Sequence, residues 1–445
     1  MLRPTTVEWR ASVAQKLLLG NWSQWQPRPT SASRDERAGQ GDPQPLRVLF
    51  VQDHLGQTLG LVHGVTRYLV STLPAFDRAA VEPFLCVLTP RHPIGAPMLE
   101  AEGVEPLFLA REKWDPRAVL DLIRLVRERD VDLVHVSGFK ATMLGRLAAL
   151  AAGRATVAHI HDARPMPSWL RLIQRRLGPR TDAAIAVSEA MRRTASADYG
   201  VPPKRIRVLH NGVLADRFAQ VAPDARGRIR QEQGIAADAP VIGIVGRIEP
   251  GKGITPLLRA LPTVIAHCPE AVLLVVGDGP TRGDSERLAE EIGVGAAVRF
   301  TGHRDDIPAL LAAMDVMAAP AIAEEGLPYA VLEAMCAGLP VVATRSGGPA
   351  ECVVHGESGL LVPKADVPAL AGALINVLSD ARLRAALGEG ARRRSALFSV
   401  ARHIEDLQLM YREIMAARVR QGRTSARAAG RHVLATEHDG DRPQS

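Results

Sequence analysis

Two successive sets of short apolar runs, each alternating with helical segments, constrain the fold of this chain more than any other feature. In the first half, runs rich in Val, Ile, Leu and Ala predict strands at 47–52, 81–89, 132–137, 156–162, 183–189 and 206–210. In the second half, similar runs predict strands at 241–247, 271–277, 298–302, 316–320, 340–344 and 359–362. Segments with helical periodicity separate them, for example 116–129 and 140–152. Strands that alternate with helices predict parallel sheets with right-handed crossovers.

Two such sets predict an α/β protein with two Rossmann-like domains, and 445 residues are too many for one ordinary core. The pattern lapses near 211–225, where we expect the linker. We predict that residues 46–212 form the first domain. Residues 213–417 form the second, with the last helix packing back on the first domain.

The remaining residues, 1–45 and 418–445, are predicted to be tails. Pro, Ser, Gly and charged residues dominate 27–45, a composition typical of disorder. Before it, 7–19 predicts one weakly amphipathic helix, in a tail that holds three of the five tryptophans. Such a tail is either an interfacial membrane anchor, since Trp favours that depth, or an extension that packs on its own domain.

Composition excludes several other classes of protein. No apolar run approaches the ~18 residues that a membrane span needs, and the N-terminus lacks the apolar core of a signal peptide. The four cysteines form no CxxC pair, which argues against a zinc ribbon or a disulfide scaffold. The formal charge is +7 with the excess in the first half, but no basic patch interleaves with aromatics, so no nucleic-acid partner is expected. We predict a cytoplasmic protein.

The segment 246–253, Gly-Arg-Ile-Glu-Pro-Gly-Lys-Gly, follows a strong strand and precedes a predicted helix near Ile254. Its cations, Arg247 and Lys252, flank a tight turn at the N-terminus of that helix. Backbone N–H groups, a helix dipole and two positive side chains suit a diphosphate. The alternative is a strand-to-helix turn with solvated charges, and this motif alone does not separate the two.

A second motif follows the predicted strand 316–320. Glu325 lies in the loop before a helix that begins near Pro328, and Glu333 lies a little over one turn into it. Proteins commonly bind sugars and riboses through carboxylates that accept hydrogen bonds from the hydroxyl groups. The backbone N–H groups of Gly326 and Leu327 could donate to a hydroxyl or phosphate oxygen. An acidic pair favoured by the helix dipole is the alternative, but it explains Glu333 poorly.

Three further patterns follow strands and carry weaker signals. His159 and His161 share one face of their strand, with His161 nearer its carboxyl end; a lone strand-end His is more often structural than catalytic. Gly64 ends a glycine-containing loop after the first strand, but neither half carries a GxGxxG dinucleotide fingerprint. The paired glycines of 346–351 suit either close approach to a ligand or a tight turn.

Taken together, these motifs resemble those of a retaining GT-B glycosyltransferase of family 4, from about residue 47 to about 416. The resemblance rests on Gly246-Arg247 with Lys252-Gly253, Val276-Gly277-Asp278-Gly279, Glu325-x7-Glu333, 338–343, Gly347-Gly348 with Glu351, His161-Asp162, Val187-Ser188 and Asn211-Gly212-Val213. It implies two Rossmann-like domains that face each other across a cleft. The second domain would bind a nucleotide-sugar and the first would bind the acceptor.

The resemblance also implies a role for individual residues. Arg247 and Lys252 would hold the diphosphate and stabilise the charge that develops on it. Glu325 would contact the donor sugar, Glu333 the ribose hydroxyls, and His161 would reach toward the reacting carbon. Gly64 would approach the phosphates. No cofactor or metal is expected, and retention would proceed by front-face attack.

The chain departs from the family pattern at two places. The usual pair of glycines in the first loop reads Val62-His63-Gly64, and the usual Phe-Gly after Glu-Gly reads Leu327-Pro328. The resemblance predicts a glycosyltransferase that builds a surface polysaccharide or glycolipid on a lipid-linked hydroxyl acceptor. A GT-B nucleotide-sugar epimerase or hydrolase and a catalytically silent nucleotide-binding subunit are the alternatives.

The segment 168–177 predicts a cationic amphipathic helix in the basic first domain. It suits docking on the anionic inner face of the cytoplasmic membrane, where a lipid-linked acceptor lies. A solvated helix that covers the sheet is an equally good interpretation.

Overall fold

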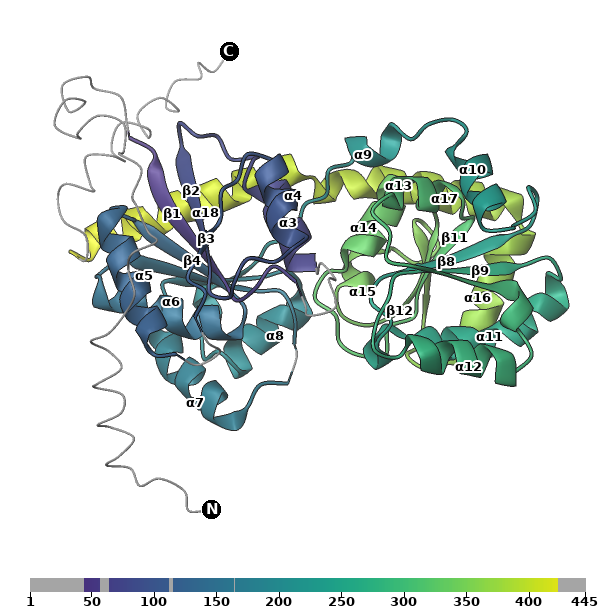
Figure 1. Ribbon diagram of the computed structural model, residues 1–445, viewed down its shortest axis with the longest axis horizontal. Coiled ribbons are helices and arrows are strands. Elements are labelled where there is room, and N and C mark those ends of the chain that lie inside the picture. Colours follow the sequence, from purple (N-terminus) through teal and green to yellow (C-terminus); the bar gives the residue numbers. More distant parts are fainter. Residues whose placement is uncertain (1–43, 57–63, 112–114, 164, 423–445) are drawn as a thin grey trace, which may run out of the picture.

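A computed structural model of the chain describes residues 44–56, 64–111, 115–163 and 165–422. The predicted helix at 7–19 and most of both tails lie outside the described residues. Within them the chain forms two lobes, each a parallel sheet with helices on both faces, so the predicted fold class is confirmed (Figure 1). None of the described helices combines the length and the apolar character that crossing a membrane requires.

The first sheet has the strand order β3-β2-β1-β4-β5-β6-β7, and every pairing in it is parallel. Its strands are β1 (Leu46–Gln52), β2 (Val81–Val87), β3 (Leu107–Phe108), β4 (Leu133–Ser137), β5 (Ala155–Ile160), β6 (Ala183–Ala186) and β7 (Ile206–Val208). The edge strand β3 was not predicted, because two residues are too few to show a β pattern.

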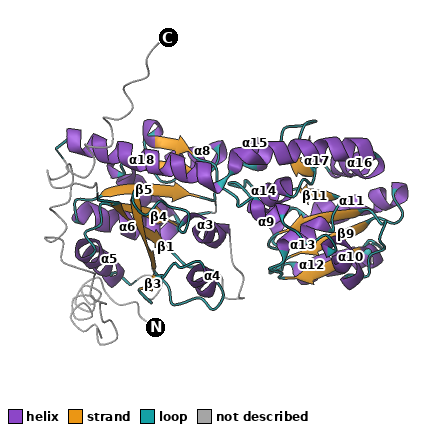
Figure 2. Ribbon diagram, turned by 90° about the horizontal axis from the view of Figure 1, so that it is seen from above, coloured by secondary structure: helices purple, strands orange, loops and turns teal. Residues whose placement is uncertain are grey.

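Helices cover both faces of this sheet, as two orthogonal views show (Figure 1, Figure 2). They are α3 (Gly64–Thr72), α4 (Gly95–Ala101), α5 (Arg117–Glu128), α6 (Phe139–Ala151), α7 (Ser168–Leu177) and α8 (Glu189–Ala197). The predicted amphipathic helix at 168–177 is α7, with the same bounds.

The second sheet has the order β10-β9-β8-β11-β12-β13, again all parallel. Its strands are β8 (Val241–Val245), β9 (Val272–Val276), β10 (Val298–Gly302), β11 (Val316–Ala319), β12 (Val341–Thr344) and β13 (Gly359–Val362). Its helices are α9 (Asp216–Ala219), α10 (Ala225–Glu232), α11 (Ile254–His267), α12 (Arg282–Glu291), α13 (Ile307–Ala312), α14 (Tyr329–Cys336), α15 (Pro349–Cys352), α16 (Val367–Ser379) and α17 (Ala381–Ser395).

The last helix, α18 (Val400–Arg420), returns to the first lobe (Figure 1). Its buried Leu407 and Tyr411 share a hydrophobic cluster with Val48 and Phe50 of β1. Where this helix begins, the two connections between the lobes run side by side, and the Val213 N–H donates to the Phe398 carbonyl at 2.8 Å. The last helix therefore follows the second domain in the chain but packs against the first.

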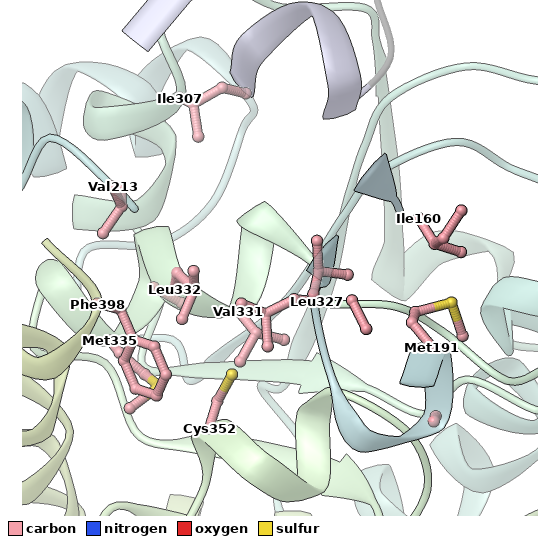
Figure 3. Close-up of a cluster of buried hydrophobic side chains, with 14 of the residues drawn as sticks. Ile160, Met191, Val213, Ile307, Leu327, Val331, Leu332, Met335, Cys352 and Phe398 are labelled. Atoms are coloured by element: carbon pink, nitrogen blue, oxygen red, sulfur yellow. The ribbon is translucent and has the colours of Figure 1, made fainter. Parts of the chain in front are cut away.

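A second apolar contact joins the lobes beneath the site described below. Figure 3 shows Leu327 and Val331 of the second lobe between Ile160 and Met191 of the first lobe on one side and Met335 on the other. All five side chains are buried. The lobes are thus held together by a continuous core as well as by the chain connections.

Candidate functional site

A cleft of about 790 Å³ lies between the carboxyl ends of the two sheets. The loops that line it follow β1, β4 and β5 of the first sheet and β8, β9 and β11 of the second. Ligands of open α/β sheets bind at this edge, because polar loop residues from neighbouring strands converge there.

Lys252 and Arg247 both line the cleft, at the turn between β8 and α11. This turn requires glycine, since Gly253 has a φ of 81° and an added Cβ would overlap the Pro320 carbonyl oxygen. The Lys252 Nζ lies 2.6 Å from Glu325 Oε1, and Arg247 Nη2 lies 3.1 Å from Glu249 Oε2. The Arg247 Nε is buried and has no hydrogen-bond partner among the described residues.

The two glutamates of the acidic doublet before α14 both line the cleft but have different partners. Glu325 is 12% exposed and faces Lys252, whereas Glu324 pairs with Lys364 at 3.0 Å and with the Ser346 hydroxyl at 3.1 Å. The hydrogen bond from Lys364 lowers the pKa of Glu324. Glu325, the residue that the motif spacing selects, is therefore the one that contacts Lys252.

Glycines let the Glu325 loop lie close to neighbouring backbone. An added Cβ at Gly326 would overlap the carbonyl oxygen of His161, and one at Gly348 would overlap the carbonyl oxygen of Gly326. The Gly348 N–H also donates to the Glu325 carbonyl at 3.1 Å. The paired glycines of the 346–351 segment thus serve close backbone packing behind the cleft.

Glu351 at the end of that segment bridges the two lobes, a contact that was not predicted. Its Oε1 accepts the Glu189 N–H at the start of α8 at 2.8 Å, and its Oε2 lies 3.0 Å from His210 Nε2. Both partners are more than a hundred residues away in the chain, so no local pattern could reveal them.

Glu333, predicted to bind ribose, does not line the cleft. It is 6% exposed, and Arg67 of α3 holds it with Nη1 at 2.8 Å from Oε1 and 3.2 Å from Oε2. Arg67 itself does line the cleft. An arginine of the first lobe therefore covers the carboxylate of the second, and Arg67 was not among the predicted site residues.

His161 lines the cleft from the first lobe, opposite the cations. Its ring stacks on His159 with centroids 3.9 Å apart, and the Tyr68 ring lies 5.0 Å from it. His159 in turn contacts His135, whose Nε2 lies 3.1 Å from His159 Nδ1. Burial, with a smaller effect from neighbouring histidines, holds the pKa of both His135 and His159 well below 6.5, so both rings are neutral.

The backbone positions that were predicted also reach the cleft. Gly64 is the first residue of α3 and lines it, as do Gly326 and Leu327. The Leu327 side chain is buried in the contact between the lobes, so only its backbone is left for a ligand. No group of three or more potential metal-binding side chains occurs among the residues for which the structure gives positions.

Two family models match the chain, one to each lobe. The model described as "Glycosyltransferase Family 4" matches residues 62–217, and the model described as "Glycosyl transferases group 1" matches residues 225–394. A GDP-mannose-dependent alpha-(1-6)-phosphatidylinositol monomannoside mannosyltransferase of Mycolicibacterium smegmatis is 36% identical over 290 residues, which are 62% of this chain and 75% of that protein. The protein of the same name from Mycobacterium tuberculosis is 32% identical over 78% of this chain and 90% of its own length.

The chain belongs to glycosyltransferase family 4. HepE of Anabaena in complex with UDP has the same architecture, with a TM-score of 0.71, 25% identity and coverage of 81% of this chain and 98% of that one. The predicted GT-B fold and the predicted nucleotide-sugar-dependent glycosyltransferase are thus confirmed.

In this glycosyltransferase the fold brings most of the predicted residues to one cleft. Lys252, Arg247 and Glu325 come from the second lobe, and His161 and Gly64 face them from the first. The exception is Glu333, which lies behind Arg67.

Proposed function

We propose that this glycosyltransferase transfers mannose from GDP-mannose to a hydroxyl group of a lipid-linked polyol, with retention of configuration. The GDP-mannose dependence and lipid acceptors named for the relatives at 32–36% identity support this donor and this acceptor. The observation that carries the proposal is the Lys252–Glu325 pair beside Arg247, with His161 on the opposite wall of the same cleft.

The residues of the cleft suit breakage of a glycosyl phosphate bond. Arg247 and Lys252 stabilise the departing diphosphate, since positioned cations in a site that excludes water act on developing charge. Glu325 exchanges its contact with Lys252 for hydroxyls of the donor sugar. Glu333 takes the ribose hydroxyls once Arg67 turns away, and the N–H groups of Gly326 and Leu327 serve donor oxygens.

The transfer step needs no nucleophilic side chain in this proposal. The acceptor oxygen forms a bond to the anomeric carbon on the face that the diphosphate leaves, as the bond from carbon to phosphate oxygen breaks. A phosphate oxygen takes the acceptor proton. His161 orients the sugar, and Gly64 at the start of α3 approaches the phosphates. The two cations supply the positive charge that a metal would supply elsewhere.

Nucleotide binding is expected to stabilise the protein selectively and without metal. GDP at a hundred times its Kd should raise the free energy of unfolding by about 2.7 kcal/mol, since a ligand that binds only the folded state stabilises it by mass action. Thermal melting with GDP, UDP, ADP and CMP, each with and without EDTA, measures this. EDTA is expected to leave the GDP shift unchanged.

Each departure from that result is informative. A shift with UDP instead of GDP would overturn the proposed base but not the transferase. A GDP shift that EDTA removes would overturn metal independence. Binding of GDP without transfer to any lipid acceptor in a membrane extract would favour a catalytically silent subunit.

The outer surface of α7 supports a membrane-bound acceptor. Trp169 is 49% exposed and Leu172 is 57% exposed, and Arg176 follows them on the same face of the helix. Arg175 is also exposed. Exposed aromatic and aliphatic side chains beside arginines are typical of helices that lie in the interface of an anionic bilayer.

Charge reversal on α7 is expected to lower binding to anionic vesicles at least tenfold. The variant is Arg175→Glu with Arg176→Glu, because each basic residue near an anionic surface contributes about 1 kcal/mol. Arg171 is left unchanged since it pairs with Asp198 at 3.1 Å. Co-sedimentation with phosphatidylglycerol vesicles measures the effect.

The matched control reverses two exposed arginines of α17, Arg382 and Arg393, on the second lobe. That variant carries the same change in net charge and is expected to keep most of its vesicle binding. If both variants lost vesicle binding equally, the loss would reflect net charge alone. That result would contradict docking through α7.

A further inference from the structure

Three polar residues lie side by side at the carboxyl edge of the first sheet. The register pairs Gln52 of β1 with Ser137 of β4, and Ser137 with His159 of β5. Residues that pair in a parallel sheet point to the same face, so the three side chains form one row. All three are buried, with exposed fractions of 3%, 6% and 1%, and all three line the cleft.

Each member of this row has a polar atom without a hydrogen-bond partner among the described residues. The atoms are Gln52 Oε1, Ser137 Oγ and His159 Nε2. Unpartnered buried polar atoms cost free energy and are uncommon in folded proteins. Three of them in register across neighbouring strands, at the wall of a cleft, indicate a surface built for a polar ligand.

The protein anchors the far side of this row. His159 Nδ1 lies 3.1 Å from His135 Nε2, and His135 Nδ1 lies 2.6 Å from the Tyr411 hydroxyl of α18. The Gln52 Nε2 donates to the His54 carbonyl at 3.4 Å. Two of the three side chains are thus held at one polar atom, and the other polar atom of each has no partner among the described residues.

The chemistry of the row selects neutral hydroxyl groups. The Gln52 oxygen accepts hydrogen bonds, the Ser137 hydroxyl both donates and accepts, and a neutral imidazole nitrogen does one or the other. None of the three carries a positive charge, so the row does not suit a phosphate or carboxylate. Strands lie about 4.8 Å apart, a spacing that a six-membered ring with several hydroxyls can bridge.

We propose that Gln52, Ser137 and His159 form a subsite for the ring hydroxyls of a cyclic polyol in the acceptor. The inference rests on the proposed function, since it places the acceptor in the first lobe. His161 follows His159 by two residues and its ring stacks on His159. A polyol bound along the row therefore lies beside the residue that faces the donor.

The test measures polyol binding directly, in the GDP-bound protein. Myo-inositol and methyl α-mannoside are the probes, cyclohexanol is the ring without further hydroxyls, and saturation-transfer NMR titrations give each Kd. Both polyols are expected to bind and cyclohexanol is not. Ser137→Ala should raise the polyol Kd about fivefold to tenfold, because it removes one hydrogen-bonding group. Gln52→Met, which keeps the side-chain length, should do the same.

The matched control is Thr142→Val, which removes another buried hydroxyl without a hydrogen-bond partner among the described residues. Thr142 lies on α6 and does not line the cleft, so its loss should leave polyol binding unchanged. The GDP-induced melting shift is expected to be the same in all three variants and in the unmodified protein.

Two results would overturn the subsite. One is a polyol Kd that neither Ser137→Ala nor Gln52→Met changes, and the other is no polyol binding by the unmodified protein. Failure of the proposed function itself gives a different result, namely loss of the GDP shift in the unmodified protein. Melting temperatures measured without ligand identify a variant that misfolds. If one of Ser137→Ala and Gln52→Met misfolds, the polyol Kd of the other variant tests the subsite.

Discussion

Lys252→Ala is expected to lower kcat by about a hundredfold to a thousandfold while the protein still folds. Lys252 lies in the turn just before α11, and its Nζ contacts Glu325 inside the cleft. A preorganised charged donor aimed at developing negative charge contributes roughly 3 kcal/mol to the transition state in other enzymes. Steady-state rates of GDP release from GDP-mannose, with a lipid extract as acceptor, measure the loss.

Arg259→Ala is the matched control, because Arg259 is an exposed cation of α11, the helix that follows Lys252, and does not line the cleft. It is expected to keep nearly full activity. The Lys252→Ala variant could instead show a higher KM for the donor with an unchanged kcat. That result would mean that Lys252 stabilises the bound substrate and the transition state equally. That outcome would contradict its assignment to leaving-group stabilisation.

Opposite effects on nucleotide affinity are expected from the two partners of the Arg67–Glu333 pair. Glu333→Gln should weaken GDP binding tenfold to a hundredfold, since hydrogen bonds to a charged group contribute about 1.5–3 kcal/mol. Arg67→Met should strengthen GDP binding several-fold, because the carboxylate no longer has to exchange a partly buried ion pair for the ribose hydroxyls. Isothermal titration with GDP measures both variants.

The direction for Arg67→Met is the decisive part of this prediction. Weaker GDP binding in that variant would mean that Arg67 itself contacts the nucleotide, and the idea of competition with ribose would fail. The melting temperature without nucleotide is expected to fall in Arg67→Met, since Glu333 is then a buried carboxylate without its cation. Arg382→Ser, at an exposed position of the second lobe, is the control and should change neither the affinity for GDP nor the melting temperature.

The Lys252–Glu325 and Arg67–Glu333 ion pairs have a common property. Glu325 is held by Lys252 and Glu333 by Arg67, so both carboxylates assigned to the donor are already neutralised by cations. Under the proposed function, the hydroxyls of a nucleotide-sugar would replace these two cations as partners of the carboxylates. The Arg67–Glu333 pair also joins the two lobes, as does Glu351 through Glu189 and His210.

The sequence by itself determined the fold class, because alternating strand and helix patterns are local and all twelve predicted strands are present. It also determined which residues of the second lobe line the cleft. Lys252 and Glu325 lie beside strand ends, and parallel strands bring such residues together at one edge of a sheet. Among the described strands, only β3 was not predicted, because two residues are too few to show an alternating pattern.

Tertiary structure alone decided which groups from distant segments meet. Arg67 covers Glu333 across 266 residues, and Glu351 reaches Glu189 across 162 residues. The row of Gln52, Ser137 and His159 exists only through the strand order β1-β4-β5 and its register. Local patterns encode helices and strands because their periods repeat along the chain, whereas these contacts depend on how complete sheets and lobes pack.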